Sequence, residues 1–203
     1  MKKNKTSKNW IKKQHRDQFF KESKLKGYRS RSFSKLVEMN NKFKILKKNT
    51  NLLDLGSSPG GWSQVAAKTI TNGKILSIDI KPMEKIDNVS FLKANLLDSQ
   101  INKKIEYFFR KKIDVVISDM AANTTGNKNL DSNMTGELCL TAMRIAEEIL
   151  HKDGVFLSKV FMGTIFKEVI DKAEKTFKKV TKYKPLASRK ESKEVYIYCN
   201  GLV

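Results

Sequence analysis

Apolar positions along the chain follow two different periods. Short apolar runs predict seven strands, at residues 51–56, 74–79, 89–92, 113–119, 155–161, 180–183 and 195–198. Apolar residues about 3.6 positions apart predict helices at 61–70, 99–111, 133–151 and 165–177, and another from Ser32 onward. Because parallel strands need crossover connections, this alternation indicates an α/β fold, with a mostly parallel seven-stranded sheet and helices on both faces.

The signals between these elements indicate one folded domain. Lys152-Asp153-Gly154 is a helix-ending signal, and the polar, glycine-containing residues 121–132 predict a loop long enough to be functional. The sequence shows no internal repeat or flexible linker, and its 203 residues suffice for one independent core. We therefore predict a domain at residues 28–203, preceded by a basic extension at residues 1–27.

Aromatic residues lie among the lysines of this extension, namely Trp10, Phe19 and Phe20. Such rings can stack on unpaired bases. The alternative, which we favour, is that they dock an N-terminal helix against the domain.

Net charge is the clearest feature of the composition. Forty-one Lys and Arg residues against twenty-one Asp and Glu residues give +20, and residues 1–50 alone hold seventeen basic and three acidic residues. Such a field attracts polyanions, which favours nucleic acid as the partner. The alternative is a solvated lysine surface inflated by an AT-rich genome. A membrane surface is less favoured, because no amphipathic helix with a broad apolar face accompanies the charge.

The rest of the composition bears on compartment and metal content. No apolar stretch approaches the roughly 20 residues that span a bilayer, and the basic N-terminus lacks the apolar core of a secretory signal. Cys139 and Cys199 suit free thiols in a reducing compartment, so we expect a cytoplasmic protein. His15 and His151 are the only histidines, which argues against a metal site. Nothing indicates an obligate partner surface, so we expect a monomer.

The first candidate ligand site follows the strand at 51–56. The segment Asp54-Leu55-Gly56-Ser57-Ser58-Pro59-Gly60-Gly61-Trp62 joins a strand to a helix through a glycine-rich turn, which brings backbone N–H groups close to a ligand. Asp79 ends the next strand, where a carboxylate can accept hydrogen bonds from both ribose hydroxyls of an adenosine. The alternative is a tight turn with a strand-end Asp that caps a helix. The glycine spacing is not G-x-G-x-x-G, which disfavours a nicotinamide dehydrogenase.

Asp119 and Lys159 are the second candidate site. Asp119 ends the apolar strand at 113–119, at the edge where such sheets bind ligands. Lys159 interrupts the strand at 155–161, and burying an ammonium without a partner is costly. Lys159 therefore either faces water on an edge strand or points into the crevice beside Asp119, where it is a candidate base.

Taken in order, these segments resemble the FtsJ/RrmJ family of ribosomal RNA large-subunit 2′-O-ribose methyltransferases. The resemblance covers nearly the whole chain from about residue 16, and it rests on Tyr28 to Leu36, Asp54 to Gln64, Asp79 to Met83, Ser118 to Ala121, Lys159 to Phe161 and Ser192 to Tyr196. It implies a Rossmann-like class I methyltransferase fold and S-adenosylmethionine as methyl donor, with no metal.

The resemblance also implies roles for individual residues. It implies a catalytic tetrad of Lys35, Asp119, Lys159 and Glu194. It implies a methyl-donor site lined by Gly60, Trp62, Asp79, Asn95 and Asp119. We expect the basic arm to hold RNA phosphates around the target, together with Arg29, Arg31 and Lys35.

Two positions depart from the family pattern. Asn95 stands where the family usually has an Asp that accepts a hydrogen bond from the adenine amino group. The Asn carbonyl oxygen can still accept this bond, so we expect weaker donor binding. Ala122 replaces the proline of the family's Ala-Pro-Asn, which should leave that loop less pre-organised.

The chemistry explains why such residues are needed. The donor methyl is transferred in line from a sulfonium, so aligning the ribose oxygen is the main task. Removing the hydroxyl proton helps, and lysine accepts a proton only in its neutral form, which a nearby ammonium and partial desolvation favour. We expect Lys159 to be the proton acceptor and Asp119 to orient its amine, while Lys35 and Glu194 hold the nucleotide.

The resemblance implies a uridine in the A-loop of 23S-type rRNA as the target, within the assembled large subunit. One alternative keeps the chemistry but acts on tRNA or an mRNA cap. Another is a non-catalytic RNA-binding ribosome-assembly factor on the same scaffold. The complete tetrad argues against the second alternative, because a decayed site is expected to have lost at least one of the four residues.

Overall fold

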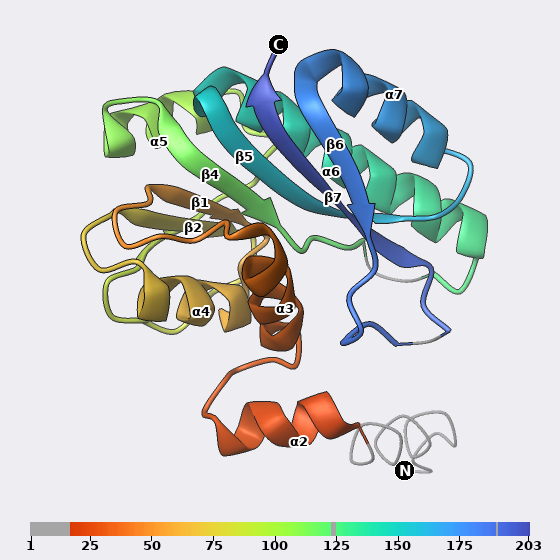
Figure 1. Ribbon diagram of the computed structural model, residues 1–203, viewed down its shortest axis with the longest axis horizontal. Coiled ribbons are helices and arrows are strands. Elements are labelled where there is room, and N and C mark those ends of the chain that lie inside the picture. Colours follow the sequence, from red (N-terminus) through yellow and green to blue (C-terminus); the bar gives the residue numbers. More distant parts are fainter. Residues whose placement is uncertain (1–16, 123–124, 190) are drawn as a thin grey trace.

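The structure is a computed structural model that describes residues 17–122, 125–189 and 191–203. At its centre lies a seven-stranded sheet with the order β3-β2-β1-β4-β5-β7-β6, covered by helices on both faces (Figure 1). The strands are β1 (Leu52–Leu55), β2 (Ile75–Asp79), β3 (Ser90–Lys93), β4 (Ile113–Ser118), β5 (Leu150–Phe161), β6 (Phe177–Tyr183) and β7 (Glu194–Leu202). The helices are α2 (Gln18–Leu25), α3 (Phe33–Phe43), α4 (Gly61–Thr69), α5 (Ile101–Phe109), α6 (Lys128–Ile149) and α7 (Phe166–Thr176).

The sheet is parallel from β3 through β5, and β7 runs antiparallel to both β5 and β6. The prediction of a mostly parallel seven-stranded α/β fold is therefore confirmed. Because β7 is reversed, its first residue lies beside the last residue of β5, and Glu194 is the register partner of Phe161. This reversal brings the start of β7 to the ligand-binding edge of the parallel strands.

Two apolar cores lie on opposite faces of the sheet. Leu52 packs with residues of α3 and α4, whereas Leu53 packs with residues of α5, α6 and α7. Neighbouring residues of a strand point to opposite faces, so β1 is buried at all four positions. Burying each such leucine contributes about 1.5–3 kcal/mol, which fixes the central strands that carry the site.

The predicted boundaries around α6 and β5 were wrong. The helix expected at 133–151 spans Lys128–Ile149, and β5 begins directly after it at Leu150. The expected helix-ending signal at residues 152–154 therefore lies inside β5. Ile113 pairs with Leu150 and Val115 with Val155, so residues 151–154 form an irregularity between two paired positions. The regular pairing starts at Val155, where the sequence predicted the strand.

The described part of the N-terminal extension contains α2. The Asp17 side chain caps this helix by accepting a hydrogen bond from the Phe19 backbone N–H at 3.1 Å, and it pairs with Arg31 at 3.1 Å. The Phe19 ring lies 5.8 Å from the Arg31 guanidinium carbon. These contacts support the docking interpretation for Phe19, whereas Trp10 lies outside the described residues.

Among the helices of the described segments, none combines the length and apolarity needed to cross a membrane.

Candidate active site

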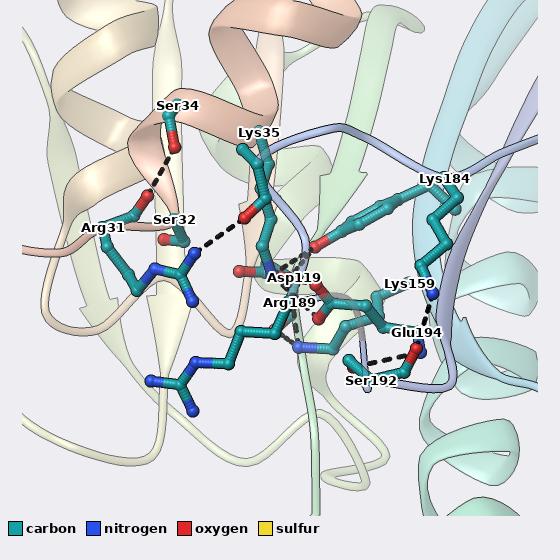
Figure 2. Close-up of polar contacts among 12 residues, drawn as sticks. Arg31, Ser32, Ser34, Lys35, Asp119, Lys159, Lys184, Arg189, Ser192 and Glu194 are labelled. Carbon is teal, nitrogen blue, oxygen red and sulfur yellow. Dashed lines mark hydrogen bonds and ion pairs between the residues drawn. The ribbon is translucent and has the colours of Figure 1, made fainter. Parts of the chain in front are cut away.

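Four side chains that are far apart in the sequence converge at the carboxyl ends of β4 and β5 (Figure 2). Asp119 directly follows β4, Lys159 lies near the end of β5, and Glu194 begins β7. Lys35 lies in the first turn of α3. The structure thus brings together all four residues of the predicted tetrad.

Hydrogen bonds join these side chains into one network. Lys159 Nζ donates to Asp119 Oδ1 at 3.0 Å and to the Asp119 main-chain oxygen at 2.6 Å. Lys35 Nζ donates to Glu194 Oε2 at 2.8 Å. The Tyr196 hydroxyl links the two pairs, because it donates to Asp119 Oδ1 at 2.5 Å and accepts from Lys35 Nζ at 3.3 Å.

The network is largely withdrawn from solvent. Lys35, Lys159 and Glu194 are 8%, 7% and 8% exposed, and Tyr196 is fully buried. The alternative that Lys159 faces water on an edge strand is wrong, since β5 lies between β4 and β7. Burial of two ammonium groups is tolerable because each has a carboxylate partner.

The network sets the protonation of its acidic members. Burial alone would raise the pKa of Asp119, but the charges of Lys159 and Lys35 and the hydrogen bonds from Tyr196 and Lys159 outweigh it and hold this pKa below its usual range. Burial, followed by the charges of Asp119 and Glu194, raises the pKa of Tyr196 well above its usual value. Asp119 is therefore a carboxylate acceptor and Tyr196 a hydroxyl donor at neutral pH.

The role of Tyr196 was not predicted from the sequence, although Tyr196 belongs to the Ser192 to Tyr196 segment on which the family resemblance rests. Tyr196 is the register partner of Lys159, and it lies two residues after Glu194 on the same face of β7. The period of a strand therefore offered a signal, but only once Glu194 had been placed in the site.

The glycine-rich turn lies at the same edge of the sheet, after β1. Gly56 and Gly60 have φ angles of +74° and +111°, which disfavour any residue with a Cβ. Asp79, the last residue of β2, accepts the backbone N–H of Ser58 at 2.9 Å and that of Lys81 at 2.7 Å. The alternative that Asp79 caps a helix is wrong for α4, whose N-cap is Gly60 and has no side-chain cap.

Asp54 adds a third carboxylate to this region. Its side chain is 1% exposed and accepts a hydrogen bond from Ser63 Oγ at 2.6 Å. Burial raises the pKa of Asp54 to about 7 against the effect of this hydrogen bond, and the charges of Asp119 and Asp79 add to the rise. The carboxyl groups of Asp119 and Asp79 are thus close enough to act on Asp54 electrostatically.

Two other residues that were predicted to line the donor site, Asn95 and Trp62, differ in their exposure to solvent. Asn95 follows β3 and is exposed, and its Oδ1 accepts the backbone N–H of Leu97 at 3.0 Å. Trp62 is 3% exposed, and its Nε1 donates to the Ser32 carbonyl at 2.8 Å. The Trp62 indole therefore fixes the start of α3, the helix that carries Lys35.

The two arginines that were predicted to bind RNA donate hydrogen bonds to main-chain carbonyls of loops near the site. The Arg29 guanidinium donates to the carbonyls of Glu84 at 2.7 Å and Lys85 at 2.8 Å. Arg31 pairs with Asp17 and also donates to the Ala187 carbonyl at 2.7 Å. Lys35, the third residue of that prediction, belongs to the buried network, and the phosphate contacts of all three stay predictions.

Within the described part of the chain, no group of three or more His, Cys, Asp and Glu side chains is arranged to hold a metal ion.

Comparisons with known proteins agree with this geometry. Residues 28–202 match the model of the family described as FtsJ-like methyltransferase. The chain is 49% identical over 202 residues to a protein of Pelagibacter ubique (strain HTCC1062) named ribosomal RNA large subunit methyltransferase E, with 100% of both chains covered. A protein of the same name from Rickettsia akari (strain Hartford) is 39% identical, covering 95% of this chain and 87% of its own.

A solved structure also resembles the chain. A Plasmodium falciparum chain described as a ribosomal RNA methyltransferase superposes with a TM-score of 0.78 at 33% identity, over 86% of this chain and 98% of its own. The fold is therefore the Rossmann-like methyltransferase fold that the sequence predicted. The chain belongs to the family of FtsJ-like methyltransferases.

Proposed function

We propose that this methyltransferase transfers a methyl group from S-adenosylmethionine to a ribose 2′-hydroxyl of large-subunit ribosomal RNA, with Lys159 as proton acceptor. The observation that carries the proposal is the buried pair of Lys159 and Asp119 at the ligand-binding edge of the sheet, 3.0 Å apart. The names of the relatives support ribosomal RNA as the substrate, and the net charge of +20 favours a polyanion.

The residues at this edge fit the chemistry of the proposed methyl donor. The donor carries a sulfonium, and the carboxylates of Asp79 and Asp119 stand at the ends of β2 and β4, where they can interact favourably with a positive charge. Each Asp79 oxygen accepts one backbone N–H and retains a lone pair for a ribose hydroxyl. When bound, the donor supplies an activated methyl group, and we propose that it is held by Gly60, Trp62, Asp79, Asn95 and Asp119.

Lys159 is proposed to receive the proton of the ribose hydroxyl. Two oxygens of Asp119 direct its amine, one from the carboxylate and one from the main chain. In its neutral form Lys159 takes the proton, and the adjacent Asp119 carboxylate stabilises the resulting ammonium. Lys35 and Glu194 are proposed to hold the ribose, and Tyr196 keeps their pair joined to Asp119.

The finer points of the function are also proposals. We propose a uridine of the A-loop within the assembled large subunit as the target, a catalytic domain at residues 28–203, and a monomeric cytoplasmic enzyme. The alternatives are tRNA or an mRNA cap as substrate, or a non-catalytic assembly factor. The intact network favours catalysis, because a protein that only binds RNA does not need four paired buried charges.

Mass-spectrometric mapping of ribose methylation tests the proposal. Large ribosomal subunits lacking the modification would be incubated with the protein and S-adenosylmethionine, and with tRNA and capped RNA as competing substrates. We expect one new 2′-O-methyl group on the large-subunit RNA. A methyl group on a base, or methylation of tRNA or capped RNA alone, would contradict the proposal, and donor binding without any transfer would favour the assembly factor.

A further inference from the structure

A second surface lies at the opposite side of the sheet from β6, in a groove lined by α5, the start of β2 and the edge strand β3. The groove has a volume of about 1010 Å³ and lies open to solvent. β3 is separated from β4 by β2 and β1, and the groove is lined by the start of β2 and by β3, away from the strand ends where the tetrad lies. It shares no lining residue with the predicted catalytic or donor sites.

The charges around this groove have one sign. Its basic side chains are Lys74, Lys103, Lys104 and Arg110, and among the described residues that line it none is Asp or Glu. Lys104 has an acidic partner, Asp98, at 2.7 Å. Lys103 and Arg110 are exposed, so their charges are available to a polyanion.

Aromatic rings lie between these cations. Tyr107 is 76% exposed, and the Arg110 guanidinium carbon lies 5.6 Å from its ring centre. The Phe108 ring has Lys74 Nζ at 5.5 Å. Phe108 is half-buried, so Tyr107 is the exposed ring of this pair. An exposed ring flanked by cations is a combination with which proteins bind single-stranded nucleic acid, through base stacking and phosphate contacts.

We propose that this groove binds an unpaired segment of the substrate RNA, away from the nucleotide that is methylated. Tyr107 stacks on a base, and Lys103, Arg110 and Lys74 contact the neighbouring phosphates. The identity of the RNA rests on the proposed function. Such a contact would let the enzyme recognise a second part of its substrate while the target ribose occupies the tetrad.

Two variants test the groove with little risk to the fold. Tyr107→Ala removes an exposed ring, and Lys103→Gln/Arg110→Asn removes two exposed charges. Asn is chosen at position 110 because Arg110 has a φ of +58°, which Asn tolerates better than most residues. The matched control is Lys175→Gln/Lys179→Gln, which removes two exposed lysines at the other side of the sheet, on α7 and β6. Equal melting temperatures for all four proteins would establish that they fold alike.

The measurements are the Kd for large ribosomal subunits that lack the modification, at several salt concentrations, and the KM and kcat for methylation of the same subunits. For Tyr107→Ala we expect about tenfold weaker binding with an unchanged salt slope, as for the loss of one stacked base. For Lys103→Gln/Arg110→Asn we expect the slope of log K against log salt to become shallower by about 1.4, the value for two phosphates of a single strand. KM should rise in both variants while kcat at saturating RNA stays within about twofold of the unmodified enzyme, and the control should match the unmodified enzyme.

The outcomes separate this inference from the proposed function. If the unmodified protein methylates the RNA and the groove variants bind and react as the control does, the inference is overturned and the proposed function stands. If the unmodified protein binds RNA in a groove-dependent way but transfers no methyl group, the proposed function fails and the inference stands. An unmodified protein that does not bind the large subunits would overturn both.

Discussion

At the scale of single residues, the buried network depends on each of its members. Lys35, Lys159, Asp119 and Glu194 form two ion pairs, and Tyr196 connects them through its hydroxyl. A buried charge that loses its partner costs several kcal/mol, so a truncation in this network affects stability as well as chemistry. Conservative substitutions therefore separate the two effects better than alanine.

Lys159 should be essential for proton removal. Lys159→Ala should lower the single-turnover rate with bound RNA by a factor of about 10²–10⁴, the usual contribution of a general base. Lys159→Arg should be as inactive, because the guanidinium stays protonated and therefore cannot accept the proton of the ribose hydroxyl. Rapid-quench assays with tritiated donor give these rates, with Lys182→Arg, at an exposed lysine of β6, as the control. Near-normal transfer by Lys159→Arg would exclude Lys159 as the base.

Tyr196→Phe should retain the ring packing and lose the bridge between Asp119 and Lys35. The hydrogen bond from Tyr196 helps to hold down the pKa of Asp119, so this pKa should rise in the variant. The pKa of Asp119, followed by NMR titration of its carboxyl carbon, should then be higher than in the unmodified protein, and the free energy of unfolding should fall by about 1–3 kcal/mol, the cost of unsatisfied buried partners. An unchanged pKa of Asp119 in Tyr196→Phe would show that the hydroxyl does not act on Asp119.

Asp54 should make the protein less stable as the pH rises. Its pKa is about 7 in the folded protein against 3.8 ordinarily, so the folded state binds a proton more tightly than the unfolded state. The resulting stabilisation is complete below about pH 4 and is lost as the pH rises to about 7. Asp54→Asn, which can still accept the Ser63 hydrogen bond, should raise the free energy of unfolding by a few kcal/mol at pH 8 and by less at pH 5.

Urea unfolding of the Asp54→Asn protein at the two pH values measures this difference. Asp153→Asn is the control, because Asp153 is exposed. The same pH dependence in Asp54→Asn and in the unmodified protein would mean that another group is responsible.

At the scale of elements, α3 holds the loop that leads into β7. Glu38 of α3 accepts hydrogen bonds from the Tyr183 hydroxyl at 2.6 Å and from the backbone N–H groups of Leu186 at 2.8 Å and Ala187 at 3.2 Å. Figure 1 shows this loop between β6 and β7 extending toward α2. One carboxylate thus joins the helix of Lys35 to the segment that precedes Glu194.

The pKa of Tyr183 depends on the contact between Glu38 of α3 and this loop. The hydrogen bond to Glu38, followed by burial and the charge of Glu38, raises the pKa of Tyr183 to about 12. Glu38→Gln removes the charge and weakens the hydrogen bond, so this pKa should fall toward its ordinary value near 10. Absorbance titration of the phenolate measures it, and Tyr183→Phe identifies the transition. An unchanged titration in Glu38→Gln would show that Glu38 does not hold the loop through Tyr183.

At the scale of the whole molecule, the dominant property is the net charge of +20. Part of this charge is used inside the protein, since Arg29, Arg31 and Lys35 bind carbonyls or carboxylates. Exposed cations such as those of the groove along α5 remain for a polyanionic partner.

Binding to ribosomal RNA should therefore weaken steeply with salt. Log K should fall linearly with log salt concentration, with a slope of several units, because each neutralised phosphate contributes about 0.7–0.9. Filter-binding or fluorescence titrations from low to physiological salt measure this slope. An affinity that does not change with salt would contradict an electrostatic interface.

The sequence by itself determined the class of fold and the members of the tetrad. Apolar periods indicate strands and helices because burial acts on each element separately, and Asp119 and Lys159 stand at strand ends that parallel pairing must bring to one edge. Glu194 and Lys35 were placed through their resemblance to family motifs. The residues next to Lys35 and next to Glu194 in the sequence do not indicate that these two side chains, 159 positions apart, are hydrogen-bond partners.

Only the tertiary structure decided which partner each polar side chain takes. It assigned Tyr196 to the network, Trp62 to the start of α3, and Arg29 and Arg31 to loop carbonyls. It also placed the start of β5 at Leu150, which pairs with Ile113 of β4, whereas the sequence predicted that the preceding helix would continue to residue 151. The physical reason is that hydrogen bonds act over about 3 Å, so they depend on the packing of distant segments, whereas hydrophobic periodicity is already present in each segment alone.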